Sequence, residues 1–344
     1  MNDKLRYWRK NTVIKLSPIS DNLKKEYFEK ISEDFEIFLE SLKDKENTQD
    51  LNEIKITEYK REVLKIYKYL EDSNGENWKL DKEKIKKLLI GDLKELLRAM
   101  DYIGPITSKR LKDKFGEFYK KISNRDFLQE WALKIGVTVC PYCNRNFIFT
   151  VPRHTGNGGV RPEYDHFFPK SKYPYLAASM YNLIPSCSVC NKAKSNRNSY
   201  KNHEVQYLYP YEEGYGEQIV LKIEDKNKPT DKVTAWLGSA EEYTVYPECS
   251  KEVDSEKKKR VENSWEMFKL GPLYEKHSDY IRNILQAKQI YTEEYLEQLV
   301  KNFPSAFDSM DDLKNMVYFN YLDEKDWGKR ILAKLTHDLE ADNP

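Results

Sequence analysis

Four of the five cysteines stand in two pairs whose partners are separated by two residues. Cys140 and Cys143 form the first pair, and Cys187 and Cys190 form the second. A tight turn between paired cysteines directs both sulfurs at one ion, and two such pairs complete a tetrahedral site with no open position. We expect no secretion signal in this chain, so the pattern favours structural zinc over disulfides. Cys249 has no such partner, and we expect it to pack as a small apolar side chain.

The segment between the cysteine pairs carries further reactive residues. It contains Asp165, His166 and Asn182, and Asn191 directly follows the second pair. Near pH 7 a neutral imidazole can take a proton from water. A carboxylate and an amide oxygen form the hard ligand set that suits Mg²⁺ or Mn²⁺. These are the groups that metal-assisted hydrolysis of a phosphodiester requires.

The order of these residues resembles the HNH (ββα-metal) endonuclease motif in a His-Asn-Asn form. Pro169 three residues after the histidine, Leu183 after the middle asparagine and Lys194 after Asn191 agree with that motif. The resemblance covers about residues 136–203. It implies a small fold of strands and a helix around a catalytic metal ion.

The resemblance also implies a role for each residue. His166 is expected to be the general base, with its second nitrogen held by the backbone carbonyl of Asn182, whose side chain braces the loop. Asp165 and Asn191 are expected to bind the catalytic Mg²⁺ or Mn²⁺. Neighbours in a strand point to opposite faces, so Asp165 and His166 can flank one phosphate at a curved strand end.

Positive charge is concentrated around the motif. Residues 140–202 hold nine Lys or Arg and two acidic residues, a net charge of +7, whereas the rest of the chain carries −6. We expect basic side chains of this segment to contact nucleic-acid phosphates. They are Lys170, Lys172, Lys192, Lys194 and Arg197. His154 and His203 are near the motif but match no position in it, and we assign them no role.

Helical periodicity dominates on both sides of the motif. Apolar residues recur at steps of three and four in four stripes, over residues 23–42, 64–70, 85–97 and 108–122. Ser20 and Asp21 are good caps for the first stripe, and residues 72–77 predict a turn. Such stripes usually form a core, and a partner-binding face is the alternative.

The centre and the C-terminal part predict a mixed structure. Residues 146–151 and 163–168 are the best strand candidates, joined through a glycine-rich segment. Residues 217–225 and 241–247 alternate weakly and predict a hairpin. Helices are expected to resume near residue 254, and Ser309 with Asp312 predicts another capped helix.

The predicted fold class is therefore α+β, with a central zinc-stabilised ββα-metal HNH module and mainly helical N- and C-terminal flanks. We place a helical region at 1–125, the HNH nuclease module at 126–211, and a mixed, then helical region at 212–344. Charged residues make up 33% of the chain. The sequence contains no run of 18 or more apolar residues, so we expect no membrane span. We expect a cytoplasmic protein.

A wider resemblance rests on the layout and on the segment RYWRKNTVIKLSPISDNLKKE, Arg6–Glu26. It is similar to the nuclease subunit of Septu-type anti-phage defence systems, which works with an ABC/SMC-type ATPase subunit. This resemblance implies an effector that cuts DNA and helical flanks that dock the ATPase. The alternatives are a stand-alone restriction-type HNH nuclease and a non-catalytic zinc-stabilised nucleic-acid-binding module. RNA stays open as a substrate.

Overall fold

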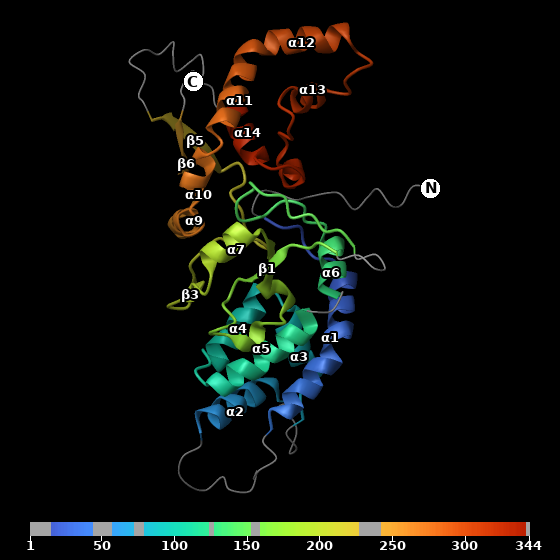
Figure 1. Cartoon of the computed structure of the whole chain (residues 1–344), viewed down its shortest axis with the longest axis vertical. Coiled ribbons are helices and arrows are strands. Elements are labelled where there is room, and N and C mark those ends of the chain that lie inside the picture. Colours follow the sequence, from blue (N-terminus) through green and yellow to red (C-terminus); the bar gives the residue numbers. More distant parts are fainter. Residues whose placement is uncertain are drawn as a thin grey trace.

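The computed structural model describes residues 15–43, 57–71, 79–123, 127–152, 159–226 and 242–341. Figure 1 shows an elongated arrangement, with the N-terminal helices at one end, the C-terminal helices at the other, and the short strand β1 with helix α7 between them. The predicted α+β fold, a small β-region between mainly helical flanks, is confirmed. The domain boundaries stay a prediction.

Six helices precede the central strands in the described ranges. They are α1 (Asp21–Ser41), α2 (Glu58–Leu70), α3 (Lys82–Ile90), α4 (Leu93–Ile103), α5 (Lys109–Ser123) and α6 (Phe127–Ile135). The predicted cap of the first helix is confirmed, because the Ser20 side chain accepts a hydrogen bond from Leu23 N. Tyr27, Ile31 and Phe35 recur every four residues along the buried face of α1.

The stripe over residues 85–97 is not one helix, because the chain breaks at Gly91 and Asp92. A Cβ at Gly91 would lie 2.1 Å from the Lys87 carbonyl oxygen, so the position has no space for a side chain. Asp92 accepts a hydrogen bond from Glu95 N and starts α4 as its N-cap. The predicted turn at residues 72–77 lies outside the described residues.

The central β-region is an antiparallel pair of strands, β1 (Glu163–His166) and β2 (Leu183–Ser186). Two short 3₁₀ turns, η1 (Pro174–Leu176) and η2 (Met180–Asn182), lie between the strands, and helix α7 (Ser188–Lys194) follows β2. The strand predicted at 163–168 is confirmed over residues 163–166 as β1.

The strand predicted at 146–151 is wrong. Phe147 makes a single bridge with Val139, and Val151 makes another with Val160. The backbone here closes the turn that carries the first cysteine pair instead, since Cys140 N donates to Asn146 O at 2.9 Å. Strand β1 pairs with β2.

The other elements of the described ranges follow α7 in the sequence. They are β3 (Tyr200–Lys201), β4 (Glu204–Val205), β5 (Ile219–Asp225), β6 (Tyr243–Cys249), α9 (Ser255–Met267), α10 (Leu270–Glu275), α11 (Ser278–Ile290), α12 (Glu293–Asn302), α13 (Met310–Val317), η3 (Glu324–Lys329) and α14 (Ala333–Ala341). The predicted hairpin is confirmed as the antiparallel pair of β5 and β6. Helices resume at α9 as predicted, with Asp254 as the N-cap, and the predicted cap at Ser309 is confirmed for α13. Cys249 is partly buried against the apolar core.

Both helical flanks hold parts of the central region in place. On the N-terminal side, Tyr27 OH donates to Ala178 O at 2.9 Å and Tyr175 OH donates to Gly104 O at 2.9 Å. On the C-terminal side, Tyr274 OH donates to Cys143 O at 2.7 Å. None of the helices in the described ranges is both long enough and apolar enough to span a membrane.

Candidate active site and structural metal centre

The four paired cysteines converge on one point. The sulfurs of Cys140, Cys143, Cys187 and Cys190 all lie within 4.8 Å of one another, and all four residues are buried. Tetrahedral zinc with bonds of about 2.3 Å requires sulfurs about 3.8 Å apart. The cluster therefore fits the structural zinc ion that the sequence predicts.

Local hydrogen bonds explain why each cysteine pair adopts its turn. Arg145 N donates to Cys143 Sγ at 3.4 Å, and Cys190 N donates to Cys187 Sγ at 3.4 Å. Asn144, which lies between Cys143 and Arg145, has a φ of 45°. Asparagine tolerates this backbone conformation better than most residues. The Asn146 side chain adds a donor to Cys187 Sγ at 3.4 Å. Such donors stabilise the thiolates that bind zinc.

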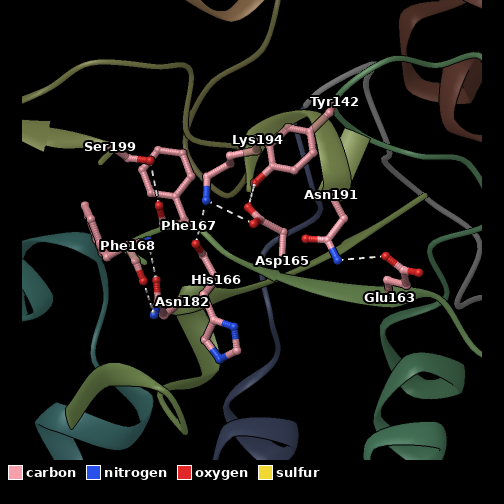
Figure 2. Close-up of polar contacts among 10 residues, drawn as sticks. All are labelled: Tyr142, Glu163, Asp165, His166, Phe167, Phe168, Asn182, Asn191, Lys194 and Ser199. Atoms are coloured by element: carbon pink, nitrogen blue, oxygen red, sulfur yellow. Dashed lines mark hydrogen bonds and ion pairs between the residues drawn. The ribbon is translucent and has the colours of Figure 1, made fainter. Parts of the chain in front are cut away.

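The second cysteine pair fixes the start of α7. Cys187 is the N-cap of this helix, and Cys190 lies in its first turn. Asn191 and Lys194 are three residues apart and share one helix face. That face meets β1, where Glu163 and Asp165 are two residues apart and also share one face. Figure 2 shows the two contacts that join β1 to α7, from Glu163 to Asn191 and from Asp165 to Lys194.

Asp165 lies in a buried network. Its Oδ1 is 2.9 Å from Lys194 Nζ, and its Oδ2 accepts a hydrogen bond from Tyr142 OH at 2.7 Å. Lys194 also donates to the backbone oxygen of His166 at 2.6 Å. Burial raises the pKa of Asp165, and the charge of Lys194 opposes this shift. Each carboxylate oxygen has a second lone pair, so Asp165 still fits a metal ligand.

Lys194 does not fit its predicted contact with phosphate, because its side chain is 0% exposed. A long basic side chain next to a carboxylate can be drawn inward as a counter-ion, and here that pairing removes the ammonium from the surface. Lys194 is a structural partner of Asp165.

His166 is held in one tautomer. Its Nε2 lies 3.1 Å from the Ala177 carbonyl oxygen. Because a carbonyl only accepts, Nε2 carries the proton and Nδ1 keeps the lone pair. The Tyr119 ring packs against the imidazole at a centroid distance of 4.6 Å. Burial, reinforced by the charge of Lys170, lowers the pKa of His166 to about 3, so the ring is neutral at pH 7.

The predicted hydrogen-bond acceptor of His166, the backbone carbonyl of Asn182, is wrong, because the acceptor is the Ala177 carbonyl. The Asn182 carbonyl accepts from Phe167 N at 3.0 Å instead, because the loop between β1 and β2 folds back and places Ala177 nearer the ring. The Asn182 side chain does brace that loop. Its Oδ1 accepts from Phe168 N at 2.7 Å, and its Nδ2 donates to the Leu176 oxygen at 3.0 Å.

Asp165, His166 and Asn191 line one pocket of about 290 Å³. The other residues around it are Tyr119, Tyr164, Pro169, Lys170, Lys192, Ser195 and Asn196. In Figure 2 the imidazole of His166 and the carboxylate of Asp165 leave β1 in opposite directions, as their alternation in a strand requires.

Two of the predicted basic residues, Lys170 and Lys192, are exposed at this pocket. Arg197 is exposed outside the pocket lining, and the Lys172 ammonium lies over the Tyr173 ring at 5.8 Å. His203 contacts Asp101 at 2.9 Å in the turn between β3 and β4. His154 lies outside the described residues.

Three residues of the site were missed in the sequence. Tyr119 belongs to α5, which lies outside the motif in the sequence, and no local sequence pattern marks this residue. Tyr142 lies between Cys140 and Cys143, so its position beside two predicted zinc ligands could have marked it as a candidate. Glu163 precedes Asp165 by two residues in a predicted strand, and this spacing could have placed it on the same face.

The comparisons with known proteins agree with this site. Residues 140–197 match the family model of the HNH endonuclease. No curated protein and no solved structure is similar enough to this chain to count as a match. The matched residues form an HNH endonuclease domain, which implies a phosphodiester hydrolase acting on nucleic acid. HNH nucleases typically use a divalent metal.

Replacing Lys194 with methionine is expected to destabilise the fold by about 3–5 kcal/mol, because it leaves the Asp165 carboxylate buried without its counter-ion. Chemical denaturation of the zinc-loaded protein measures this effect. Lys192→Met on the same helix is the matched control and should change stability by less than about 0.5 kcal/mol, since Lys192 is exposed. Equal stability of the two variants would contradict the structural role of Lys194.

Proposed function

We propose that this chain is a metal-dependent HNH endonuclease that hydrolyses phosphodiester bonds of DNA. The observation that carries this proposal is the shared pocket, which brings His166, Asp165 and Asn191 together although Asn191 follows His166 by 25 residues. A neutral imidazole, a carboxylate and an amide oxygen at one concave site are the groups that activate water and bind a hard cation.

His166 would act through Nδ1. Its Nε2–H stays on the Ala177 carbonyl while Nδ1 accepts a proton from the attacking water. A general base works best with a pKa near the ambient pH. The negative charge of a bound phosphate raises the pKa of a neighbouring imidazole, which moves His166 toward that range once substrate is present.

Asp165 and Asn191 would hold Mg²⁺ or Mn²⁺, which when bound would offset negative charge on the phosphate and on the leaving oxygen. Lys170 and Lys192 would contact neighbouring phosphates at the pocket, with Lys172 and Arg197 farther along the strand of DNA. We place the nuclease module at residues 126–211. A cytoplasmic location would keep its thiols reduced for zinc.

Purified protein incubated with plasmid and with RNA, in Mg²⁺, Mn²⁺ or EDTA, tests this function. We expect cleavage of DNA with either ion and none with EDTA. Asp165→Ala and Asn191→Ala should raise the metal concentration needed for half-maximal cleavage. Undiminished cleavage in EDTA, or cleavage of RNA alone, would contradict the proposal.

We further propose that the enzyme is the effector subunit of an anti-phage defence complex with an ABC/SMC-type ATPase. Support comes from the N-terminal resemblance, although residues 6–14 of that segment lie outside the described residues, and from the net −6 outside residues 140–202. Co-purification with an ATPase encoded beside it tests this role. Specific cutting of duplex DNA by the isolated chain would favour the stand-alone restriction-type alternative.

A further inference from the structure

Glu163 contacts the amide of Asn191 from the neighbouring strand. Its Oε2 accepts a hydrogen bond from Asn191 Nδ2 at 2.7 Å, and its side chain is exposed (Figure 2). A carboxylate only accepts hydrogen bonds, so the end of the amide that faces Glu163 must be the NH₂ group. The amide oxygen of Asn191 then points the other way, toward Asp165.

This orientation matters because the two ends of an amide are nearly identical in shape and opposite in polarity. An asparagine without a partner at its NH₂ group can turn that group toward a cation and repel it. Only the oxygen is a ligand for Mg²⁺ or Mn²⁺. A group that fixes the NH₂ end therefore also fixes the ligand end.

The arrangement of β1 and α7 makes Glu163 the residue that can do this. Glu163 and Asp165 lie on the same face of β1, and each carboxylate contacts one side chain of α7. Asp165 pairs with Lys194 in the interior, whereas Glu163 pairs with Asn191 near the pocket. Cys187 caps α7 and Cys190 lies in its first turn, so a zinc ion held by the four cysteines would fix the start of this helix before the catalytic metal arrives.

We propose that Glu163 is a positioning residue that orients the Asn191 amide so that its oxygen faces the catalytic metal. This inference rests on the proposed nuclease function, because it assumes an ion held by Asp165 and Asn191. Glu163 acts through its hydrogen bond to Asn191 and does not itself bind the ion. Partners that orient metal ligands in this way typically contribute roughly 10- to 100-fold to metal affinity or activity.

Binding of Mn²⁺ to the zinc-loaded full chain, followed by electron paramagnetic resonance, tests the proposal without relying on catalysis. Glu163→Ala should weaken Mn²⁺ binding by roughly tenfold or more. Glu163→Gln should retain most of the affinity, because the glutamine oxygen can still accept from Asn191 Nδ2. Glu248→Ala, at an exposed glutamate on β6, is the control and should bind like the wild type.

Two outcomes would overturn the proposal. Wild-type Mn²⁺ affinity in Glu163→Ala would show that the contact does not orient a ligand. A loss in Glu163→Gln equal to that in Glu163→Ala would show that the negative charge acts directly on the ion. A double-mutant cycle adds a third criterion: in an Asn191→Ala background, Glu163→Ala should cause no further loss, and additive losses would refute action through Asn191.

Different results would contradict the nuclease function and the positioning role of Glu163. Cleavage that survives Asp165→Ala and Asn191→Ala at unchanged metal dependence would remove the proposed metal site itself. Metal-dependent cleavage that is lost in those variants but unchanged in Glu163→Ala, together with normal Mn²⁺ binding, would leave the nuclease intact and remove only the role of Glu163.

Discussion

His166→Ala is expected to reduce the rate of phosphodiester cleavage by roughly 10²- to 10⁴-fold, the usual contribution of a positioned general base. The imidazole donates one hydrogen bond to a loop carbonyl and packs against Tyr119, so its removal takes away the proton acceptor and little of the fold. Single-turnover cleavage of plasmid at saturating metal measures this loss. Zinc content and the unfolding midpoint should remain close to those of the wild type.

His203→Ala provides the matched control for this substitution. His203 lies 37 residues after His166, and its side chain is 82% exposed and is not among the residues that line the pocket. Its removal should leave cleavage unchanged. If His166→Ala cuts as fast as the wild type, another group takes the proton, and the proposed chemistry of the pocket is wrong.

Cys187→Ser should abolish zinc binding and unfold the central region. Zinc binding supplies folding free energy, with apparent values of about 10–16 kcal/mol in small zinc domains. Cys187 also caps α7, so its loss removes the fixed start of the helix that carries Asn191. Metal analysis of the purified protein and limited proteolysis between β1 and α7 measure the two effects. Cys143→Ser should behave in the same way.

Cys249→Ser serves as the control for the zinc ligands, since Cys249 ends β6 and is not part of the sulfur cluster. It should keep full zinc content and normal resistance to protease. Wild-type protein that contains no zinc would count against the metal centre. So would a folded Cys187→Ser variant with one zinc ion per chain.

Features that depend on short stretches of sequence could be predicted well. The predicted caps at Ser20 and Ser309 follow from side chains that reach backbone groups within three residues. The four zinc cysteines follow from their spacing within each pair. The break at Gly91 was missed because the apolar stripe continues through it, and only the approach of the Lys87 carbonyl shows why no side chain fits there.

Features that depend on distant contacts could not be predicted. Residues 183–186 contain a proline and show no alternation, so only their pairing with β1 identifies them as a strand. Tyr119 and His166 are 47 residues apart, and their contact requires α5 to pack beside the loop. In the sequence Lys194 is one of several basic residues. Only the structure shows that its Nζ lies 2.9 Å from Asp165 Oδ1.

The attachment of the loop between β1 and β2 to the N-terminal helices limits how this nuclease can be engineered. The Ala178 carbonyl accepts a hydrogen bond from Tyr27 OH of α1, and the Ser179 hydroxyl donates one to the Leu88 carbonyl of α3. The neighbouring Ala177 carbonyl selects the tautomer of His166. A transplant of residues 136–203 into a foreign scaffold would carry every motif residue and omit these anchors. We therefore expect a minimal version of the enzyme to need α1 and α3 in addition to the motif.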